Sequence, residues 1–184
     1  MASVADQLMT AEEFLTYVGP PGCKVELVRG EVVTRCLPGF RQGLSQGRIS
    51  SILNQYSRTT RLGRAVVETG VRTDRGPDTV RGPDVSYWSA ERLPLDQVPV
   101  GYPEAAPDMC VEVLSPHNRL ARIREKMREY FAREVRMVWV VDPEDRTLTV
   151  YRSLGEGLLL HENATVQVED VLPGFRCQVA ELFS

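Results

Sequence analysis

The chain has 184 residues, a length that suits one domain with a full hydrophobic core, so we expect residues 1–184 to form a single domain. Its 42% apolar and 26% charged residues lie near the globular norm, which excludes a largely disordered chain. No apolar run is long enough to span a bilayer, and the first ten residues lack the pattern of a secretory signal. We therefore expect a cytoplasmic protein with no membrane partner.

Charge is distributed unevenly along the chain. The net charge of −3 argues mildly against a general nucleic-acid binder. Residues 32–67 carry six arginines and no acid, and residues 117–136 carry seven basic and three acidic residues. Residues 142–170 carry seven acids against Arg146 and Arg152. This pattern suits one basic face and one acidic end, and it suits ordinary solvated surfaces equally well.

Lysine is rare in this chain, which has twenty arginines but only two lysines, Lys24 and Lys126. An ammonium is a compact point charge whose pKa can shift, whereas a guanidinium stays charged and planar. The presence of lysine at these two positions therefore indicates a role for which arginine is unsuited. The four cysteines show no metal-ligand spacing, and the only histidines are His117 and His161, so a zinc site is not expected.

The first half of the chain predicts two helices and several strands. Thr10–Glu13 resembles a capping box, so a short helix follows and stops at Gly19. Lys24–Val28 and Glu31–Thr34 predict a hairpin around Arg29-Gly30. The next expected elements are a loop at 37–43, a helix at 45–60, a strand at 65–73 and a turn at 76–78.

The second half predicts a buried strand followed by a helix. Its expected elements are a strand at 83–88, a Pro-rich loop at 89–107, a strand at 109–114, a helix at 119–134, strands at 137–141 and 147–152, and short strands toward 179–183. Strands mixed with few helices indicate an α/β (α+β mixed) fold. We expect a mixed β-sheet flanked by helices, with an N-terminal hairpin and extra C-terminal strands.

Glu112 is a carboxylate inside an otherwise apolar strand. Alternation places Asp108, Cys110, Glu112 and Leu114 on one face, while Met109, Val111 and Val113 face the core. Burying a lone carboxylate is costly unless it is paired or binds a metal. Asp84 begins the neighbouring predicted strand, so the two acids could converge on one cation. Carboxylates with waters and phosphate oxygens are what Mg²⁺ prefers.

Lys126 falls at the edge of the buried stripe of the predicted helix, next to Ile123 and Tyr130. Its amine could therefore reach back toward the sheet. The simpler alternative for Lys126 is a surface lysine whose stem covers apolar residues. For Glu112 it is a structural ion pair with an arginine of the same helix. Taken together, the three residues favour a functional site.

A series of short motifs resembles one known family, the Uma-type family of proposed restriction endonucleases, a branch of the PD-(D/E)XK nuclease superfamily. The resemblance covers nearly the whole chain, and it depends on the order and spacing of the motifs more than on any one of them. The motifs are TAEEF (10–14), VELVRGEVV (25–33), RGPDV (81–85), PDMCVEVLSP (107–116), EK with a tyrosine (125–130), VWVVDP (138–143), VY (150–151) and VLPGF (171–175).

The resemblance implies a restriction-endonuclease-like core and a metal-dependent endonuclease that hydrolyses phosphodiester bonds of DNA. Asp84 and Glu112 match its metal-binding acids for Mg²⁺ (or Mn²⁺). The superfamily lysine would stand at Leu114, and Lys126 looks like its migrated substitute. Glu26 matches a further acidic position. Gln46 stands where relatives often carry His, which puts any His-dependent role in doubt.

Further expectations follow from the resemblance and from the basic helices. Arg48, Arg119 and Arg122 are candidates for nucleic-acid binding, and a homodimer is expected because superfamily nucleases often cut as pairs. A catalytically inactive nucleic-acid or protein binding module on a degenerate nuclease fold is the alternative. A purely structural dimerisation protein is a third. The sequence leaves open whether DNA or RNA is cut.

Overall fold

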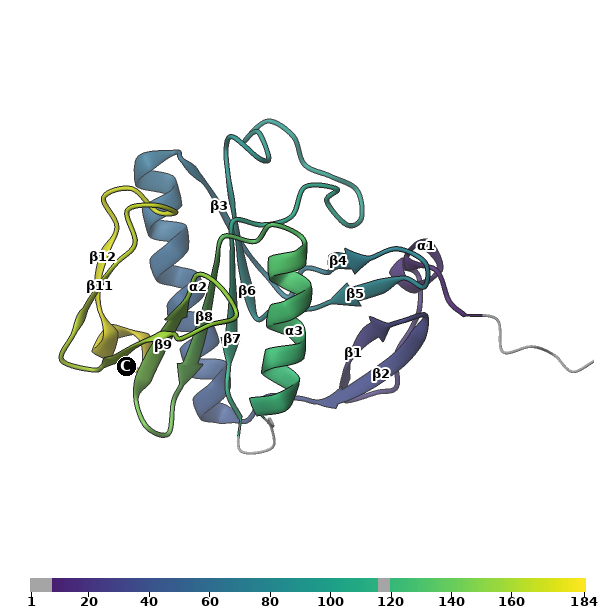
Figure 1. The fold of residues 1–184 in the computed structure, drawn as a ribbon, viewed down its shortest axis with the longest axis horizontal. Coiled ribbons are helices and arrows are strands. Elements are labelled where there is room, and N and C mark those ends of the chain that lie inside the picture. Colours follow the sequence, from purple (N-terminus) through teal and green to yellow (C-terminus); the bar gives the residue numbers. More distant parts are fainter. Residues whose placement is uncertain (1–7, 116–119) are drawn as a thin grey trace, which may run out of the picture.

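The computed structural model describes residues 8–115 and 120–184, which form two main β-sheets, a two-stranded sheet and three α-helices (Figure 1). The helices are α1 (Ala11–Leu15), α2 (Phe40–Thr60) and α3 (Leu120–Ala132), with a 3₁₀ helix, η1 (Val179–Leu182), near the C-terminus. None of the helices in this described part is long and apolar enough to cross a membrane.

The smaller main sheet has four antiparallel strands in the order β2 (Glu31–Cys36), β1 (Cys23–Val28), β5 (Thr79–Arg81) and β4 (Val71–Asp74). The predicted capping box is present, since Thr10 Oγ1 accepts from the Glu13 N–H and Glu13 accepts from the Thr10 N–H. It starts α1, which packs Ala11 and Phe14 against Leu27 of β1 and Val80 of β5. This small apolar cluster fixes one face of the sheet and leaves the other face to polar residues.

The larger sheet has six strands in the order β10, β9, β8, β7, β6, β3. Their bounds are β3 (Gly63–Val67), β6 (Val85–Ser89), β7 (Met109–Val113), β8 (Met137–Asp142), β9 (Thr147–Tyr151) and β10 (Leu158–His161). Only β7 and β8 pair in parallel, joined by the crossover through α3, and the other neighbours are antiparallel. The predicted mixed sheet is therefore confirmed.

The two faces of β7 differ in the way that alternation predicts. Met109, Val111 and Val113 belong to the main apolar cluster, which α2 and the C-terminal residues complete. Cys110 lies on the opposite face, where α3 packs Ile123 and Met127. Figure 1 shows α2 and α3 on opposite sides of this sheet, with β11 (Thr165–Gln167) and β12 (Arg176–Gln178) on the α2 side. Glu112 thus faces α3.

Three expectations about the elements were wrong. Residues 40–43 open α2 instead of lying in a loop: the Gly43 N–H donates to the Gly39 carbonyl at 2.9 Å, and Gln42 donates to the Val113 carbonyl of β7 at 3.1 Å. Residues 65–73 form two strands, β3 and β4, which belong to different sheets and are separated by Glu68 with φ 50°. The short strand β5, which lies between the expected turn at 76–78 and the expected strand at 83–88, was missed.

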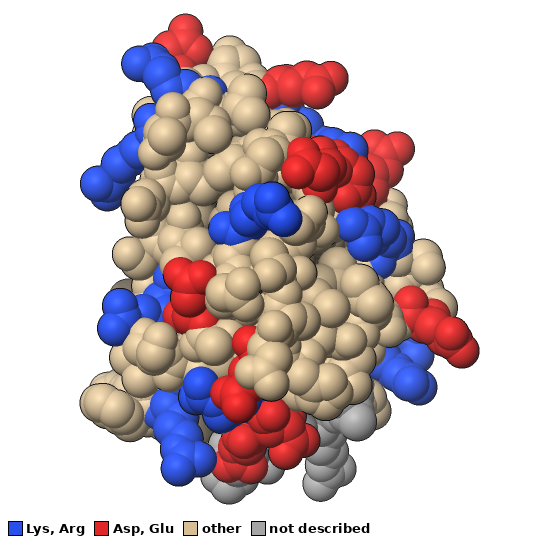
Figure 2. Space-filling view, turned by 90° about the vertical axis from the view of Figure 1, so that its left-hand side faces the viewer, with Lys and Arg blue, Asp and Glu red and all other residues tan. Residues whose placement is uncertain are grey.

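Charges on the face that carries the C-terminal strands are mixed. Figure 2 shows basic and acidic side chains interspersed there, with apolar and neutral residues between them. Arg146 pairs with Glu162 at 2.5 Å and Arg152 with Asp170 at 2.9 Å, so part of the acidic segment 142–170 is neutralised locally. This face matches ordinary solvated surface better than a separate acidic end.

Candidate active site

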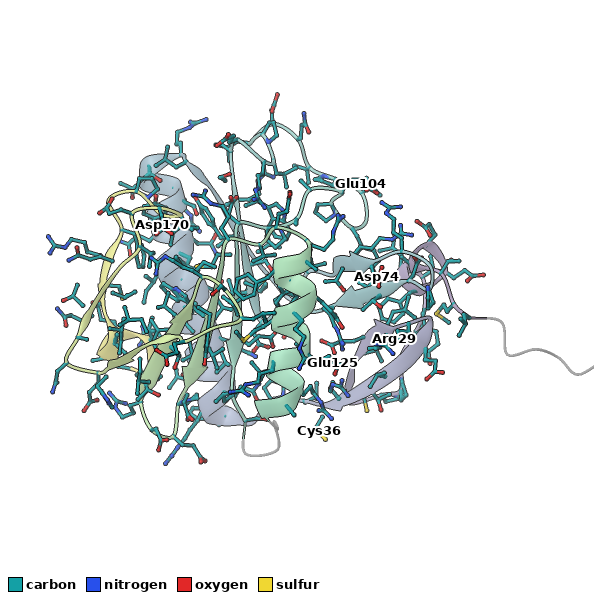
Figure 3. All side chains as sticks on the ribbon, viewed as in Figure 1. Arg29, Cys36, Asp74, Glu104, Glu125 and Asp170 are labelled. Carbon is teal, nitrogen blue, oxygen red and sulfur yellow. The ribbon has the colours of Figure 1, made fainter. Side chains whose placement is uncertain are left out.

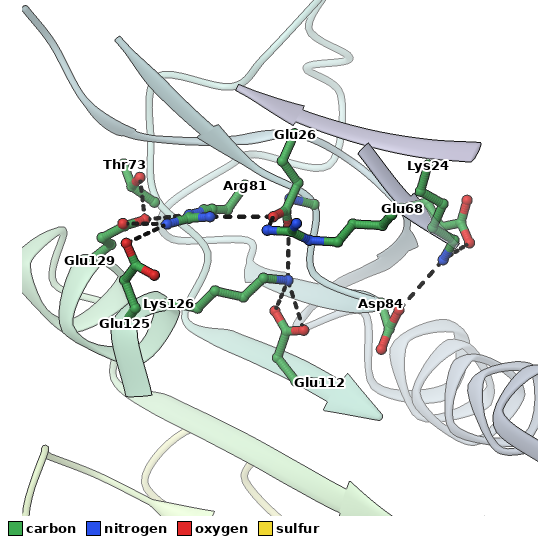
Figure 4. A network of polar contacts seen from close by, with 12 residues as sticks. Lys24, Glu26, Glu68, Thr73, Arg81, Asp84, Glu112, Glu125, Lys126 and Glu129 are labelled. Atoms are coloured by element: carbon green, nitrogen blue, oxygen red, sulfur yellow. Dashed lines mark hydrogen bonds and ion pairs between the residues drawn. The ribbon is translucent and has the colours of Figure 1, made fainter. Parts of the chain in front are cut away.

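Charged side chains gather where the two main sheets and α3 meet (Figure 4). Lys24 and Glu26, two residues apart on β1, point to the same side of the four-stranded sheet, opposite the apolar contacts of Leu27. Glu112 faces them from β7, and Lys126 faces them from α3. The same alternation that buries apolar residues on one side of each strand therefore collects ionisable groups on the other.

Asp84 lies in the short link that carries the chain from β5 in one sheet to β6 in the other. Its Oδ2 accepts a hydrogen bond from the Val113 N–H at 2.7 Å, and its backbone N–H donates to the Val111 carbonyl at 3.0 Å. Gln46 of α2 donates to Oδ1 at 2.5 Å. These contacts fix the carboxylate against β7 beside Glu112. Burial raises the pKa of Asp84, although the Val113 N–H and Lys24 work in the opposite direction.

Glu112 is buried with both carboxylate oxygens in contact with donors. Lys126 Nζ lies 3.0 Å from Oε1 and 2.9 Å from Oε2, and the Tyr130 hydroxyl donates to Oε1 at 2.6 Å. Burial, with the nearby carboxylates of Asp84 and Glu26, raises the pKa of Glu112 to about 7 despite Lys126. The site therefore holds more negative charge than its lysine neutralises.

Glu26 of β1 makes ionic contacts with α3 and with β5 of its own sheet. Its Oε1 lies 2.8 Å from Lys126 Nζ and accepts from the Gly82 N–H at 3.3 Å, and its Oε2 lies 3.3 Å from Arg81. Burial acts to raise its pKa, but Lys126 and Arg81 outweigh burial and lower it. Glu26 and Glu112 together raise the pKa of Lys126 against the effect of burial, so Lys126 stays protonated.

Arg81 is a fully buried arginine that sequence reasoning did not single out. It donates from Nε and Nη2 to the two oxygens of Glu129, both at 2.6 Å, and lies 3.5 Å from Glu125. Both acids project from α3, and Figure 3 labels Glu125 there. A bidentate arginine–carboxylate pair fixes orientation as well as distance. Arg81 thus holds α3 over the four-stranded sheet, with Lys126 between Glu26 and Glu112.

Lys24 and Glu68 complete the cluster at its more exposed end, and neither was predicted as a site residue. Lys24 Nζ lies 2.5 Å from Glu68 Oε1 and 3.5 Å from Asp84 Oδ1. The available signal was that Lys24 is one of two lysines in the chain. We call Glu26, Arg81, Glu112, Lys126 and Tyr130 the sealed side of the site, and Lys24, Glu68 and Asp84 the open side.

The remaining sequence candidates lie at different distances from this cluster. Gln46 contacts Asp84 directly. Arg48 is exposed and lies two positions further along α2, about 200° around the helix, so it points away from Asp84. Arg122 lies one turn before Lys126 on α3. Arg119 falls outside the described residues.

The donor set fits a hard divalent cation that is held partly by its substrate. Asp84 and Glu112 present carboxylates side by side, and the pKa of each is raised, so an added positive charge would stabilise both. Mg²⁺ is usually bound by one or two carboxylates together with waters and phosphate oxygens. Among the described residues, no group of three or more His, Cys, Asp or Glu is arranged to hold a metal alone. Asp84 and Glu112 would therefore hold it with help from substrate and water.

Comparison with known proteins identifies the family and the fold of the chain. A family model described as Uma2, "Putative restriction endonuclease", matches residues 11–180. A crystal structure from Anabaena variabilis ATCC 29413, described as "a putative nuclease belonging to DUF820", is similar with a TM-score of 0.80 and 23% sequence identity, over 95% of this chain and 97% of that one. At that identity the likeness establishes the fold. No curated protein matches the chain.

Proposed function

The chain belongs to the Uma2 family of restriction endonuclease-like proteins, and on that premise we propose that it is a divalent-metal-dependent endonuclease that hydrolyses phosphodiester bonds of DNA. The observation that carries the proposal is the surplus of buried negative charge. Three buried carboxylates, Glu26, Asp84 and Glu112, meet around two buried cations, Lys126 and Arg81, and Arg81 makes its shortest contacts with Glu129 of α3. Such a cluster is costly unless a cation or a cationic partner compensates it.

Each residue has a separate role in this proposal. Asp84 and Glu112 would hold Mg²⁺ or Mn²⁺, and a metal bound there would supply an activated water and charge stabilisation for the leaving oxygen. Glu26 and Arg81 keep the Lys126 ammonium against Glu112, where its positive charge stabilises charge that develops during hydrolysis. Gln46 fixes the orientation of the Asp84 carboxylate by donating to Oδ1.

The direct test measures nicking and cleavage of supercoiled plasmid DNA with Mg²⁺, with Mn²⁺ and with EDTA. We expect cleavage only with a metal. Asp84→Asn and Glu112→Gln each remove a metal ligand while keeping the shape of the side chain, so we expect each to lower the rate by about 10²-fold or more. Lys126→Met should also lower it.

Matched controls come from the C-terminal strands. Asp170→Asn and Glu162→Gln make the same chemical changes in exposed ion pairs with Arg152 and Arg146, so we expect them to leave the rate unchanged. Cleavage that is insensitive to EDTA, or that survives in Asp84→Asn and Glu112→Gln, would contradict the proposal.

One observation favours the alternative of an inactive binding module. Lys126 and Tyr130 already contact both oxygens of Glu112, so a metal has to share or displace these contacts. Calorimetric titration with Mg²⁺ and Mn²⁺ separates the two functions. Saturable binding that Asp84→Asn abolishes supports the nuclease, whereas no binding in the presence of DNA supports the module.

A homodimer and a cytoplasmic location remain expectations. Two copies would place two sites on the two strands of a duplex, as paired cutting requires. Static light scattering of the purified protein, with and without DNA, measures the number of chains directly.

A further inference from the structure

Both lysines of the chain lie in the same cluster of carboxylates, although they come from β1 and α3 and are separated by 102 positions of sequence (126 minus 24). All twenty of the other Lys or Arg residues are arginines. The two ammonium groups nevertheless differ in the length of their contacts and in their exposure. This difference indicates which of them can contact a substrate.

Carboxylate oxygens occupy all three N–H groups of the Lys126 ammonium. It contacts both oxygens of Glu112 at 3.0 and 2.9 Å and Oε1 of Glu26 at 2.8 Å, and an ammonium has three N–H groups. Its side chain is only 9% exposed. Lys126 therefore balances the charge of two buried acids, and a phosphate could reach it only after one of these contacts breaks.

The Lys24 ammonium is held much more loosely. Its side chain is 27% exposed, its contact with Asp84 is 3.5 Å long, and its one short contact is with Glu68, which is 54% exposed. An exposed ion pair contributes little free energy, so a phosphate can displace Glu68 at small cost. Glu68 itself is held close to Asp84, because its N–H donates to the Asp84 carbonyl at 3.3 Å.

Lys24 is also poorly explained as a charge partner for Asp84. The Asp84 carboxylate already accepts hydrogen bonds from Gln46 and from the Val113 N–H, both shorter than its contact with Lys24. If compensating Asp84 were the task, Lys24 would be expected to form a short pair as Lys126 does with Glu112.

Resting on the proposed nuclease function, we propose that Lys24 is the residue that binds the phosphate of the nucleic-acid strand beside Asp84, and that Glu68 holds its ammonium until the strand arrives. Lys126 then compensates the buried acids and Lys24 contacts the substrate. Glu68 acts as a weak competitor that the incoming phosphate replaces.

The test measures binding of a fluorescein-labelled DNA duplex by anisotropy across a NaCl series, with EDTA present so that cleavage does not interfere and the contacts of Lys126 with Glu112 stay intact. Each phosphate contact contributes about 0.9 to the slope of log K against log salt concentration. We expect Lys24→Gln to lower this slope by about 0.9 and Lys24→Arg to keep it, since the charge is retained. Glu68→Gln should tighten binding about twofold or more with the slope unchanged, because a competing charge is removed.

Arg152→Gln is the matched control, because Arg152 also pairs with an exposed acid but lies among the C-terminal strands. Circular dichroism and urea unfolding check that each variant is folded. An unchanged slope in folded Lys24→Gln overturns the inference and would make Lys24 a partner of Asp84 alone. Failure of the proposed function is distinct: the wild-type protein would not cleave the duplex with Mg²⁺, whereas the inference fails if the duplex is not bound or if the slope is unchanged in Lys24→Gln.

Discussion

The sealed and open sides of the site carry the same kinds of groups in different surroundings. On the sealed side, Lys126 is enclosed by Glu26 and Glu112, and buried Arg81 holds α3 in place over them. On the open side, Lys24 lies between Asp84 and an exposed glutamate. A lysine–carboxylate pair is thus part of the tertiary structure in one place and a displaceable contact in the other.

This difference indicates that burial decides what an ion pair does. Removing one partner of a buried pair leaves an uncompensated charge in a poor solvent, whereas removing one partner of an exposed pair leaves a solvated one. We therefore expect equivalent changes on the two sides to have unequal effects on stability. Three measurements test this expectation, in order of decreasing effect.

The largest effect is expected for Lys126→Met. The substitution leaves Glu112 and Glu26 buried without their shared cation, so we expect the free energy of unfolding to fall by about 3–5 kcal/mol. Urea denaturation followed by circular dichroism measures it. Adding Glu112→Gln removes one of the two orphaned charges and should restore part of the loss. A double variant no more stable than Lys126→Met would contradict the buried-charge explanation.

The second effect is a pH dependence that originates at Glu112. Its pKa is raised from 4.5 to about 7 in the folded protein, so the folded state holds this proton more tightly than the unfolded state. Stability from this group is therefore complete below about pH 4.5 and declines as the pH rises to about 7. Relative to Glu112→Gln, the wild-type free energy of unfolding should fall by about 3 kcal/mol between pH 4.5 and 8.

Urea denaturation of both proteins at a series of pH values supplies this comparison, because groups remote from Glu112 cancel in the difference. A difference that is constant across the pH range would mean that Glu112 ionises normally in the folded protein.

The smallest effect is expected for Lys24→Met. Lys24 and Glu68 are partly solvated, so the loss of this pair should change the free energy of unfolding by less than about 1 kcal/mol. The measurement is the same as for Lys126→Met, so the losses in free energy of unfolding of the two variants can be compared directly. A loss comparable to that of Lys126→Met would remove the distinction between the sealed and open sides.

Local sequence was enough to predict the elements whose pattern is complete within a few residues. The Thr10–Glu13 capping box, the Arg29-Gly30 turn and the alternation along β7 each depend on neighbours in sequence, and each is confirmed. The prediction of a single strand at residues 65–73 was wrong, because a continuous β-like pattern does not reveal that the chain changes sheets at Glu68. The predicted start of α2 was wrong because the first turn is held partly by a distant contact, Gln42 with the Val113 carbonyl, which the local sequence does not show.

The candidate site was predicted in part. Asp84, Glu112, Lys126 and Glu26 do lie together, and their chemical roles remain predictions. Arg81 and Glu129 were missed, since a buried ion pair between a three-residue strand and a helix has no local signature. The alternative that paired Glu112 with an arginine of α3 is wrong in its partner: the cation is Lys126.

The sequence by itself determined which face of each strand carries charge, because alternation fixes side-chain direction within a strand. It also marked Lys24 and Lys126 as unusual by their rarity. Only the tertiary structure decided that these faces meet between two sheets, and that one lysine is enclosed while the other stays accessible. Burial is a property of the surroundings that distant segments create, so no local pattern of residues contains it.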